Sequence, residues 1–281
     1  MPARLAANNY GKSRVRLFRV TRDGARHSVA DLAVDVALEG AYQAVHLEGD
    51  NATVLPTDTM RNTVYALAKE HAVTPVEGFG RTLVRHFLGA TEHADRARIR
   101  IAAHGWNRID VDGAPHEHSF VRGSAERRMA YVSGTRQGER FEAGIEELEV
   151  LKTTRSAFEG YIRDRFTTLP ETKDRIFATI VSARWTYASE PADFDAAFAA
   201  VRTALLTTFA GHDSKSVQQT LFAMGAAVID AVPEVSEIRL SLPNRHHLLF
   251  DLSRFEMENA NEVFVPTTEP YGLIEATVVR E

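Results

Sequence analysis

The spacing of apolar residues changes between two periods in the same order in both halves of this 281-residue chain. Alternating positions are typical of half-buried strands, and a spacing of three or four is typical of amphipathic helices. In the first half these patterns predict strands at 14–18 and 27–38, helices at 58–71 and 75–88, and strands at 99–103 and near Phe120. Asp23-Gly24 is a typical hairpin turn between the first two strands.

The second half repeats this plan. Its patterns predict strands at 148–153 and 176–187, helices at 193–209 and 216–231, and strands at 238–242, 247–252 and 273–279. The two halves show no identity at the level of residues, so the repeat is one of architecture. We therefore expect an α+β fold of two tandem ββααββ modules, residues 1–137 and 138–281, which form one compact unit. Its sheet is antiparallel and carries the helices on one face.

Two local expectations concern the starts of helices and the position of a loop. Asp58 or Thr59 is placed to act as the N-cap of the first helix, and Pro75 is placed to open the second. The stretch from Glu126 to Glu142 shows no strong pattern and is expected to be a hairpin loop of unknown role.

The composition excludes several classes of protein. Cysteine is absent, which rules out disulfides, thiolate metal sites and a cysteine nucleophile. The 38 acidic and 33 basic residues are scattered and give a net charge of -5, which argues against nucleic acid as a partner. No apolar run approaches the roughly 18 residues that span a membrane, and Met1–Asn9 lacks a signal-peptide core. The chain ends in Arg280-Glu281 and not in a peroxisomal address, so we expect a cytoplasmic protein.

An open antiparallel sheet leaves backbone groups unpaired at its edges. Pairing with other copies of the chain would satisfy those groups, so a homo-oligomer is expected on physical grounds. Its functional sites could then lie between subunits.

The segment from Leu148 to Arg175 carries the most specific pattern in the chain. Taken alone, its residues indicate a strand, a polar turn and aromatic side chains that could belong to a core. Their order and spacing, however, resemble the whole signature of the urate oxidase (uricase) family. The matching positions are Leu148, Val150, Lys152, Thr153, Thr154, Ser156, Phe158, Tyr161, Phe166, Leu169 and Arg175.

The resemblance covers nearly the whole chain and is closest to the bacterial type. The further segments that are similar to family motifs are Tyr10-Gly11-Lys12, Thr57–Thr63, Thr74-Pro75, Asp110–Gly113, Pro115–Phe120, Ser216–Gln218 and Ser241–His246. The family resemblance implies the tunnelling fold, in which four subunits stack two-module sheets into a barrel with a central tunnel. It places active sites at subunit interfaces. It also implies oxidation of urate by O2 to 5-hydroxyisourate with release of hydrogen peroxide, on the route to allantoin, with no cofactor and no metal.

The resemblance implies a set of substrate-binding residues. Urate is flat and anionic, so a binder needs an aromatic face, a cationic fork and matching amides. Phe158 resembles the residue that stacks on the purine, and Arg175 resembles the fork, which grips its edge bidentately. The contacts implied for the remaining edges are the Gln218 side chain, the Val217 backbone, Thr57 and the Asp58 N–H.

A second set of residues is implied for the oxidation itself. Lys12, Thr57 and His246 resemble a proton relay, in which a lysine of lowered pKa acts as the base. His246 would connect this relay to solvent. Asn244 resembles the amide that, with Thr57, holds O2 and then peroxide. Taken singly, each of these residues has an ordinary structural reading, such as a helix cap, a solvated lysine or a strand histidine.

Three alternatives remain open at this stage. His116 and His118 flank Glu117 with a spacing that some copper or zinc sites use, but no third ligand is well placed, so a structural loop is favoured. A pterin- or purine-processing enzyme of the same fold would use glutamate anchors, whereas this chain offers Arg175 and Gln218. A non-catalytic purine-binding relative would lack the relay, which is present here.

Overall fold

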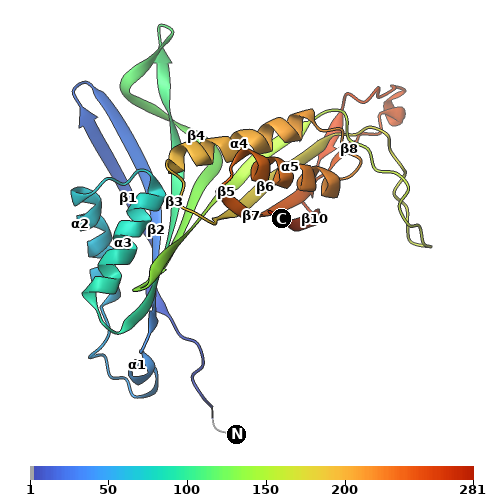
Figure 1. The fold of residues 1–281 in the computed structure, drawn as a ribbon. Coiled ribbons are helices and arrows are strands. Elements are labelled where there is room, and N and C mark those ends of the chain that lie inside the picture. Colours follow the sequence, from blue (N-terminus) through green and yellow to red (C-terminus); the bar gives the residue numbers. More distant parts are fainter. Residues whose placement is uncertain (1–2) are drawn as a thin grey trace. The chain divides into compact units, whose positions relative to one another are not determined.

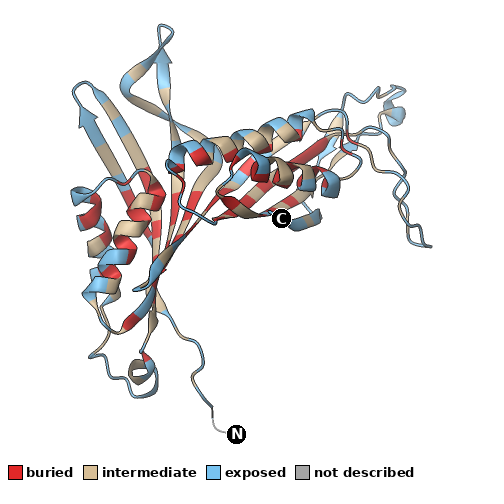
Figure 2. Cartoon of the chain, viewed as in Figure 1, coloured by how far each residue is buried: buried red, intermediate tan, exposed pale blue. Residues whose placement is uncertain are grey.

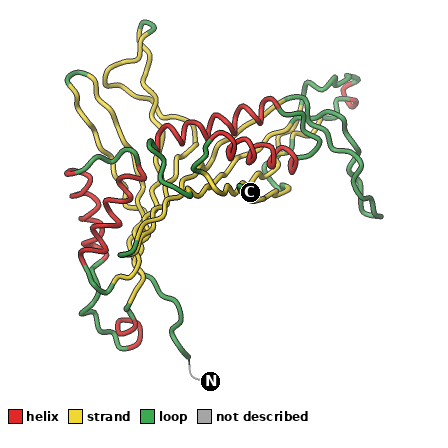
Figure 3. The backbone as a smooth tube through the Cα atoms, viewed as in Figure 1, coloured by secondary structure: helices red, strands yellow, loops and turns green. Residues whose placement is uncertain are grey.

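A computed structural model describes residues 3–281; the first two residues of Met1–Asn9 lie outside the described part. The chain divides into two compact units, Met1–Gly144 and Ile145–Glu281. Each unit contains antiparallel strands and helices in the order that the apolar periods predict, as Figure 3 shows in yellow and red. The module limits 1–137 and 138–281 stay a prediction.

The first unit builds its sheet in the strand order β1-β2-β3-β4, with each neighbouring pair antiparallel. Its elements, labelled in Figure 1, are β1 (Tyr10–Asp23), β2 (Arg26–Gly40), α1 (Gln43–Leu47), α2 (Thr57–Glu70), α3 (Val76–Ala90), β3 (Ala94–Val111) and β4 (Ala114–Thr135). The next strand, β5 (Gly138–Lys152), begins in this unit and ends in the second.

The core of the first unit lies between the helices and one face of the sheet. Alternate residues of β2 are almost completely buried, and α3 buries residues at helical spacing, as the red segments of Figure 2 show. These residues are Leu32, Val34, Val36 and Leu38 on β2, and Phe79, Leu83 and Phe87 on α3. Each such side chain contributes roughly 1.5–3 kcal/mol by leaving water. The opposite face of β2 carries the acidic residues Asp31 and Asp35.

The second unit repeats the arrangement in the strand order β5-β6-β7-β10. Its elements are β6 (Phe177–Tyr187), α4 (Phe194–Gly211), α5 (Val217–Ala231), β7 (Val235–Arg245), β8 (His247–Leu249), the short 3-10 helix η1 (Ser253–Phe255), β9 (Phe264–Pro266) and β10 (Gly272–Val279). β6 pairs with β7, and β7 with β10, both antiparallel. The helix starts follow the expected chemistry, since Asp193 caps α4 and Ser216 caps α5.

One packing device recurs in both units. A Cβ on Gly80 of α3 would lie 2.6 Å from Val132 of β4, and one on Gly225 of α5 would lie 2.5 Å from Val278 of β10. Glycine, which has no Cβ, allows α3 and α5 to approach their sheets this closely. The repeat of architecture therefore extends to packing, although the sequences of the two halves differ.

The structure corrects two local expectations. Helix α2, the first of the expected helices, begins at Thr57 with Pro56 as N-cap and no side-chain capping bond, so neither Asp58 nor Thr59 is the cap. The fixed φ of proline presets this start. The supposed loop from Glu126 to Glu142 is mostly strand, because β4 continues to Thr135 and β5 starts at Gly138. Buried and partly exposed residues alternate at the end of β4, but the arginines at 127 and 128 hide the start of this pattern in the sequence.

The strand expected at 247–252 is present as the shorter β8, whereas α1 and β9 were not predicted, because runs of three to five residues give no periodic signal. Among residues 3–281, none of the helices has the length and apolar character that crossing a bilayer requires.

Candidate active site

The segment before Phe158 lies beside the loop before α5. The Ala157 N–H donates to the Ser214 carbonyl at 2.7 Å, and the Ser214 N–H donates to the Arg155 carbonyl at 3.0 Å. Ser156 and Ser214 thereby form a parallel bridge. The signature segment is thus fixed close to the start of α5, where Val217 and Gln218 are the first two residues.

Phe158 is held next to the segment that leads to Arg175. Its N–H donates to the Thr172 carbonyl at 2.8 Å, and the Thr172 N–H donates back at 3.1 Å. The Arg175 Cζ lies 5.3 Å from the centre of the Phe158 ring, within the range of a cation–π contact. Tyr161 also stacks on this ring, with centroids 4.9 Å apart. The aromatic face and the cationic fork that the sequence indicates are therefore in contact.

The charge of Arg175 has no counter-ion among residues 3–281. The side chain is half-buried, and burial lowers its pKa from the ordinary arginine value. Within residues 3–281, the guanidinium makes neither an ion pair nor a hydrogen bond. Its contact with the Phe158 ring is a cation–π interaction. A desolvated cation without an anionic partner is costly. Its five N–H donors are free to bind a planar anion.

The start of α5 supplies further donors. The Ser216 hydroxyl accepts the Gln219 N–H at 3.2 Å, which leaves the N–H groups of Val217 and Gln218 without an acceptor among residues 3–281. Val217 is buried, whereas Gln218 is exposed with a free amide. Free N–H groups at a helix start favour negative charge.

Asn244 and His246 lie at the end of β7 in the same unit as Arg175. Asn244 pairs with Thr179 of β6 on one side and Gly272 of β10 on the other. The His246 carbonyl accepts the Thr267 N–H at 2.8 Å. Asn244 is thus a residue of β7 and His246 directly follows that strand, and in the described part of the chain neither side chain is hydrogen-bonded to Phe158 or Arg175.

Lys12, Thr57 and Asp58 belong to the first unit, where two hydrogen-bonded segments carry them. The Leu55 N–H donates to the Tyr10 hydroxyl at 3.0 Å, which brings the strand of Lys12 to the start of α2. A Cβ on Gly11 would lie 1.8 Å from the Val36 carbonyl oxygen, so the Tyr10-Gly11-Lys12 motif needs glycine at its centre.

The polar groups of these three residues differ in their availability. The Lys12 ammonium and the Thr57 hydroxyl have no hydrogen-bond partner among residues 3–281. The Asp58 carboxylate is occupied by Arg61 at 2.8 Å and Asn62 at 3.2 Å. Its N–H is free because Pro56 provides no side-chain cap. The groups available for binding are therefore the backbone N–H of Asp58 and the side chains of Lys12 and Thr57.

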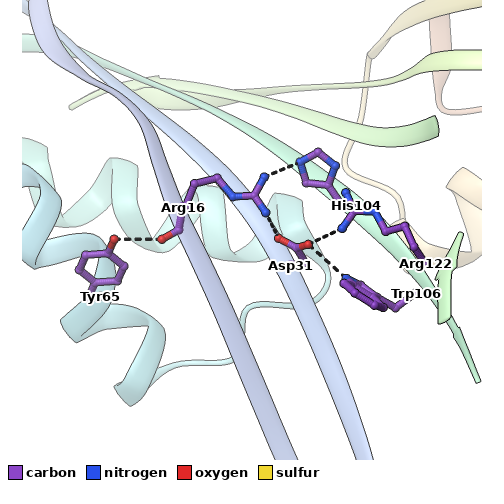
Figure 4. A network of polar contacts seen from close by, with 6 residues as sticks. All are labelled: Arg16, Asp31, Tyr65, His104, Trp106 and Arg122. Atoms are coloured by element: carbon purple, nitrogen blue, oxygen red, sulfur yellow. Dashed lines mark hydrogen bonds and ion pairs between the residues drawn. The ribbon is translucent and has the colours of Figure 1, made fainter. Parts of the chain in front are cut away.

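A second polar cluster, which the sequence did not predict, lies on the sheet of the first unit (Figure 4). The buried carboxylate of Asp31 accepts hydrogen bonds from Trp106 at 3.1 Å, from Arg122 at 2.7 Å, and from Arg16. Burial raises the pKa of Asp31, but the donors and the cationic charges outweigh it, so this pKa lies below its ordinary value. Arg16 and Arg122 are each paired with this carboxylate, which distinguishes them from Arg175.

His104 makes this cluster sensitive to pH. Its Nε2 lies 2.9 Å from an Arg16 nitrogen, and arginine only donates, so the imidazole accepts and is neutral. Burial and the charges of Arg16, Arg122 and Arg127 lower the pKa of His104 below 6.5, while Asp31 opposes the shift. Between pH 6.5 and this lowered pKa, the unfolded chain binds a proton that the folded chain does not, so stability falls as the pH falls.

We therefore expect His104→Gln to reduce the acid sensitivity of the fold. The free energy of unfolding of the wild type, measured by urea denaturation between pH 7.5 and 5, should fall more steeply than that of the variant. The matched control is His86→Gln, since His86 is an exposed histidine of α3. Equal slopes for the wild type and His104→Gln would refute this role.

The histidines considered for a metal lie on a strand and not in the expected loop. His116 and His118 belong to β4, with ring centroids 4.5 Å apart, and the His27 ring lies 5.8 Å from that of His118. Arg108 binds the carbonyls of His116 and Glu117. The loop was expected from the turn-like residues before His116, but the turn itself ends at Gly113. In the described chain, no group of three or more potential ligands is arranged to hold a metal ion.

Comparison with known families decides the relationship of this chain. The family model described as Uricase matches residues 8–133 and 141–275. The chain belongs to the uricase family. Uricase from Arthrobacter globiformis is 48% identical over 99% of this chain and 90% of its own length. Uricase from Dictyostelium discoideum is 40% identical over 99% and 98% of the two chains.

Solved structures of the family agree with the fold. The crystal structure of uricase from Arthrobacter globiformis superposes with a TM-score of 0.95 and 47% identity, covering 100% of this chain and 96% of that one. The uricase from Bacillus fastidious superposes with a TM-score of 0.85 and 25% identity, covering 98% and 94%. The expected antiparallel α+β architecture of the tunnelling fold is thereby confirmed.

Proposed function

We propose that this chain oxidises urate with O2 to 5-hydroxyisourate and releases hydrogen peroxide. One water supplies the oxygen that enters the purine, and O2 takes up two electrons and two protons. The half-buried, unpaired Arg175 guanidinium beside the Phe158 ring is the observation that carries the proposal, because it needs a planar anion. Uric acid loses a proton to give such an anion, and its further deprotonated form is electron-rich enough to reduce O2 without a metal or flavin.

The donors of the second unit would fix the urate ring in one plane. Phe158 offers its face, and the Arg175 fork grips a carbonyl and ring-nitrogen edge with two parallel hydrogen bonds. The Val217 N–H and the Gln218 amide complement another edge from the helix start. Asn244 would hold O2, and then peroxide, above this plane.

The groups of the first unit would move protons. The Lys12 side chain would act as the base that takes a proton from the bound substrate. The Thr57 hydroxyl both donates and accepts, so it can pass a proton between Lys12 and the substrate. The Asp58 N–H would bind the substrate edge, and His246 would pass protons to solvent.

We further propose that the chain works as a cytoplasmic homotetramer. In this assembly, Lys12, Thr57 and Asp58 of one copy would face Phe158, Arg175 and Gln218 of another, with a central tunnel through the barrel. The unpaired edges of β1 and β10 support an assembly of this kind.

The proposal predicts a fixed stoichiometry. Purified protein treated with a chelator should consume urate, followed by its absorbance, and O2, followed with an electrode, in equal amounts, with one hydrogen peroxide formed for each urate. Urate binding without turnover by a well-folded oligomer would instead identify a non-catalytic purine binder. Activity that the chelator abolishes would contradict oxidation without a metal.

A further inference from the structure

We infer that Asp174 is a positioning residue that holds Arg175 and Phe158 in the geometry for binding an anion. This inference rests on the proposed function. The Asp174 carboxylate joins two segments of the chain that are 18 to 20 residues apart. One oxygen accepts the Thr154 hydroxyl at 2.6 Å, and the other accepts the Ser156 N–H at 3.3 Å.

Both segments lead directly to the groups of the candidate site. Ser156 is two residues before Phe158, and Asp174 is next to Arg175. The intervening chain returns through the paired backbone bonds of Phe158 and Thr172. The carboxylate therefore lies at the base of the loop that carries the aromatic ring on one side and the guanidinium on the other.

The ionised form of Asp174 is the one that makes these bonds. The Thr154 hydroxyl lowers the pKa of Asp174 most, burial opposes the shift, and the nearby backbone N–H groups lower this pKa further. The carboxylate of Asp174 thus accepts from the Thr154 hydroxyl and the Ser156 N–H at once. A neutral or missing side chain could not satisfy all of these donors.

The same segment is also fixed on its other side. The bond from Ala157 to Ser214 joins it to the start of α5, where Val217 and Gln218 lie. The ion pair between Arg155 and Asp213 is mostly exposed, so it adds little. Loosening the Asp174 contacts would therefore shift Phe158 and Arg175 relative to each other and to the helix start. A displacement of about 1 Å at such a site can cost about a hundredfold in efficiency.

The test compares Asp174→Ala with Asp164→Ala as a matched control. Asp164 lies in the same loop and accepts from Phe166 N and the Thr167 hydroxyl at 2.9 Å, but it makes no bond to the segments around Phe158 or Arg175. Asp174→Ala should raise the KM for urate by about ten- to a hundredfold with kcat within about threefold, because the proton relay is untouched. Asp174→Asn, which keeps one acceptor oxygen, should recover part of the loss. Asp164→Ala should leave KM within about twofold.

Two further measurements keep the outcome decisive. Thr154→Val removes one donor to Asp174 with little change in volume and should raise the KM for urate about threefold to tenfold. This variant tests the inference if Asp174→Ala does not fold. The dissociation constant for urate, measured without O2, should rise in parallel. If the wild type binds urate but does not oxidise it, the proposed function fails while these constants still test Asp174. Unchanged affinity in Asp174→Ala and Thr154→Val, an equal loss in Asp164→Ala, or a fall in kcat alone would overturn the inference.

Discussion

Replacing Arg175 with alanine is expected to raise the KM for urate by at least about a hundredfold. The side chain offers two parallel charge-assisted hydrogen bonds from a half-buried position, and each bond to a charged group is worth roughly 1.5–3 kcal/mol. No carboxylate in the described chain pairs with this guanidinium. Removing the side chain therefore costs substrate-binding energy and leaves no acidic residue without its partner. Steady-state kinetics in urate, with kcat and KM separated, measure the effect.

Two further variants make this prediction specific. Arg175→Lys keeps the charge but loses the planar fork, so it should recover only part of the affinity. Arg165→Ala is the matched control, because the Arg165 Cζ also lies over a ring, 4.5 Å from the centre of the exposed Phe166. It should change KM by less than about twofold. Equal effects of Arg165→Ala and Arg175→Ala would show that a loop cation–π contact, and not anion binding, explains the loss.

Replacing Lys12 with methionine or Thr57 with alanine is expected to lower kcat by roughly a hundredfold to ten-thousandfold while KM changes little. General acid–base groups contribute rate enhancements of this size. Both groups lack a hydrogen-bond partner among residues 3–281, and the Tyr10–Leu55 bond brings their segments together. Oxygen-electrode rates at saturating urate, with KM measured in parallel, give the comparison.

Lys69→Met is the control for the lysine variant, since Lys69 is an exposed lysine in the last turn of α2, the helix that begins at Thr57. It should retain full kcat. Full turnover in Thr57→Ala would contradict the relay, and a raised KM with normal kcat in Lys12→Met would make Lys12 a binding residue.

The fold was predictable wherever a strand or helix is long and has one buried face. The buried alternation of Leu32, Val34, Val36 and Leu38 is visible in the sequence, and so is the helical spacing of Phe79, Leu83 and Phe87. The strand around Arg127 and Arg128 was missed because long polar side chains interrupt the pattern there. The start of α2 was misplaced because a proline preset the first turn without a capping side chain.

The site was predictable only in part, and for a physical reason. The spacing of the signature identifies Phe158 and Arg175, but not the contact between them, which depends on the Phe158–Thr172 pairing. Asp174 gave one signal, its position next to Arg175, but its partners at 154 and 156 appear only in the folded chain. The Asp31 cluster joins residues up to 91 positions apart, so it follows from the registers of four strands, which periodicity does not reveal.

The most direct test of urate binding at Arg175 is a crystal structure of the protein with urate bound in the absence of O2. We expect the purine ring to stack on Phe158, with its edge about 3 Å from the Arg175 nitrogens and with the Gln218 amide in the same plane. Lys12 and Thr57, from another copy, should face the ring. Urate bound elsewhere, with Arg175 contacting only solvent, would contradict the account.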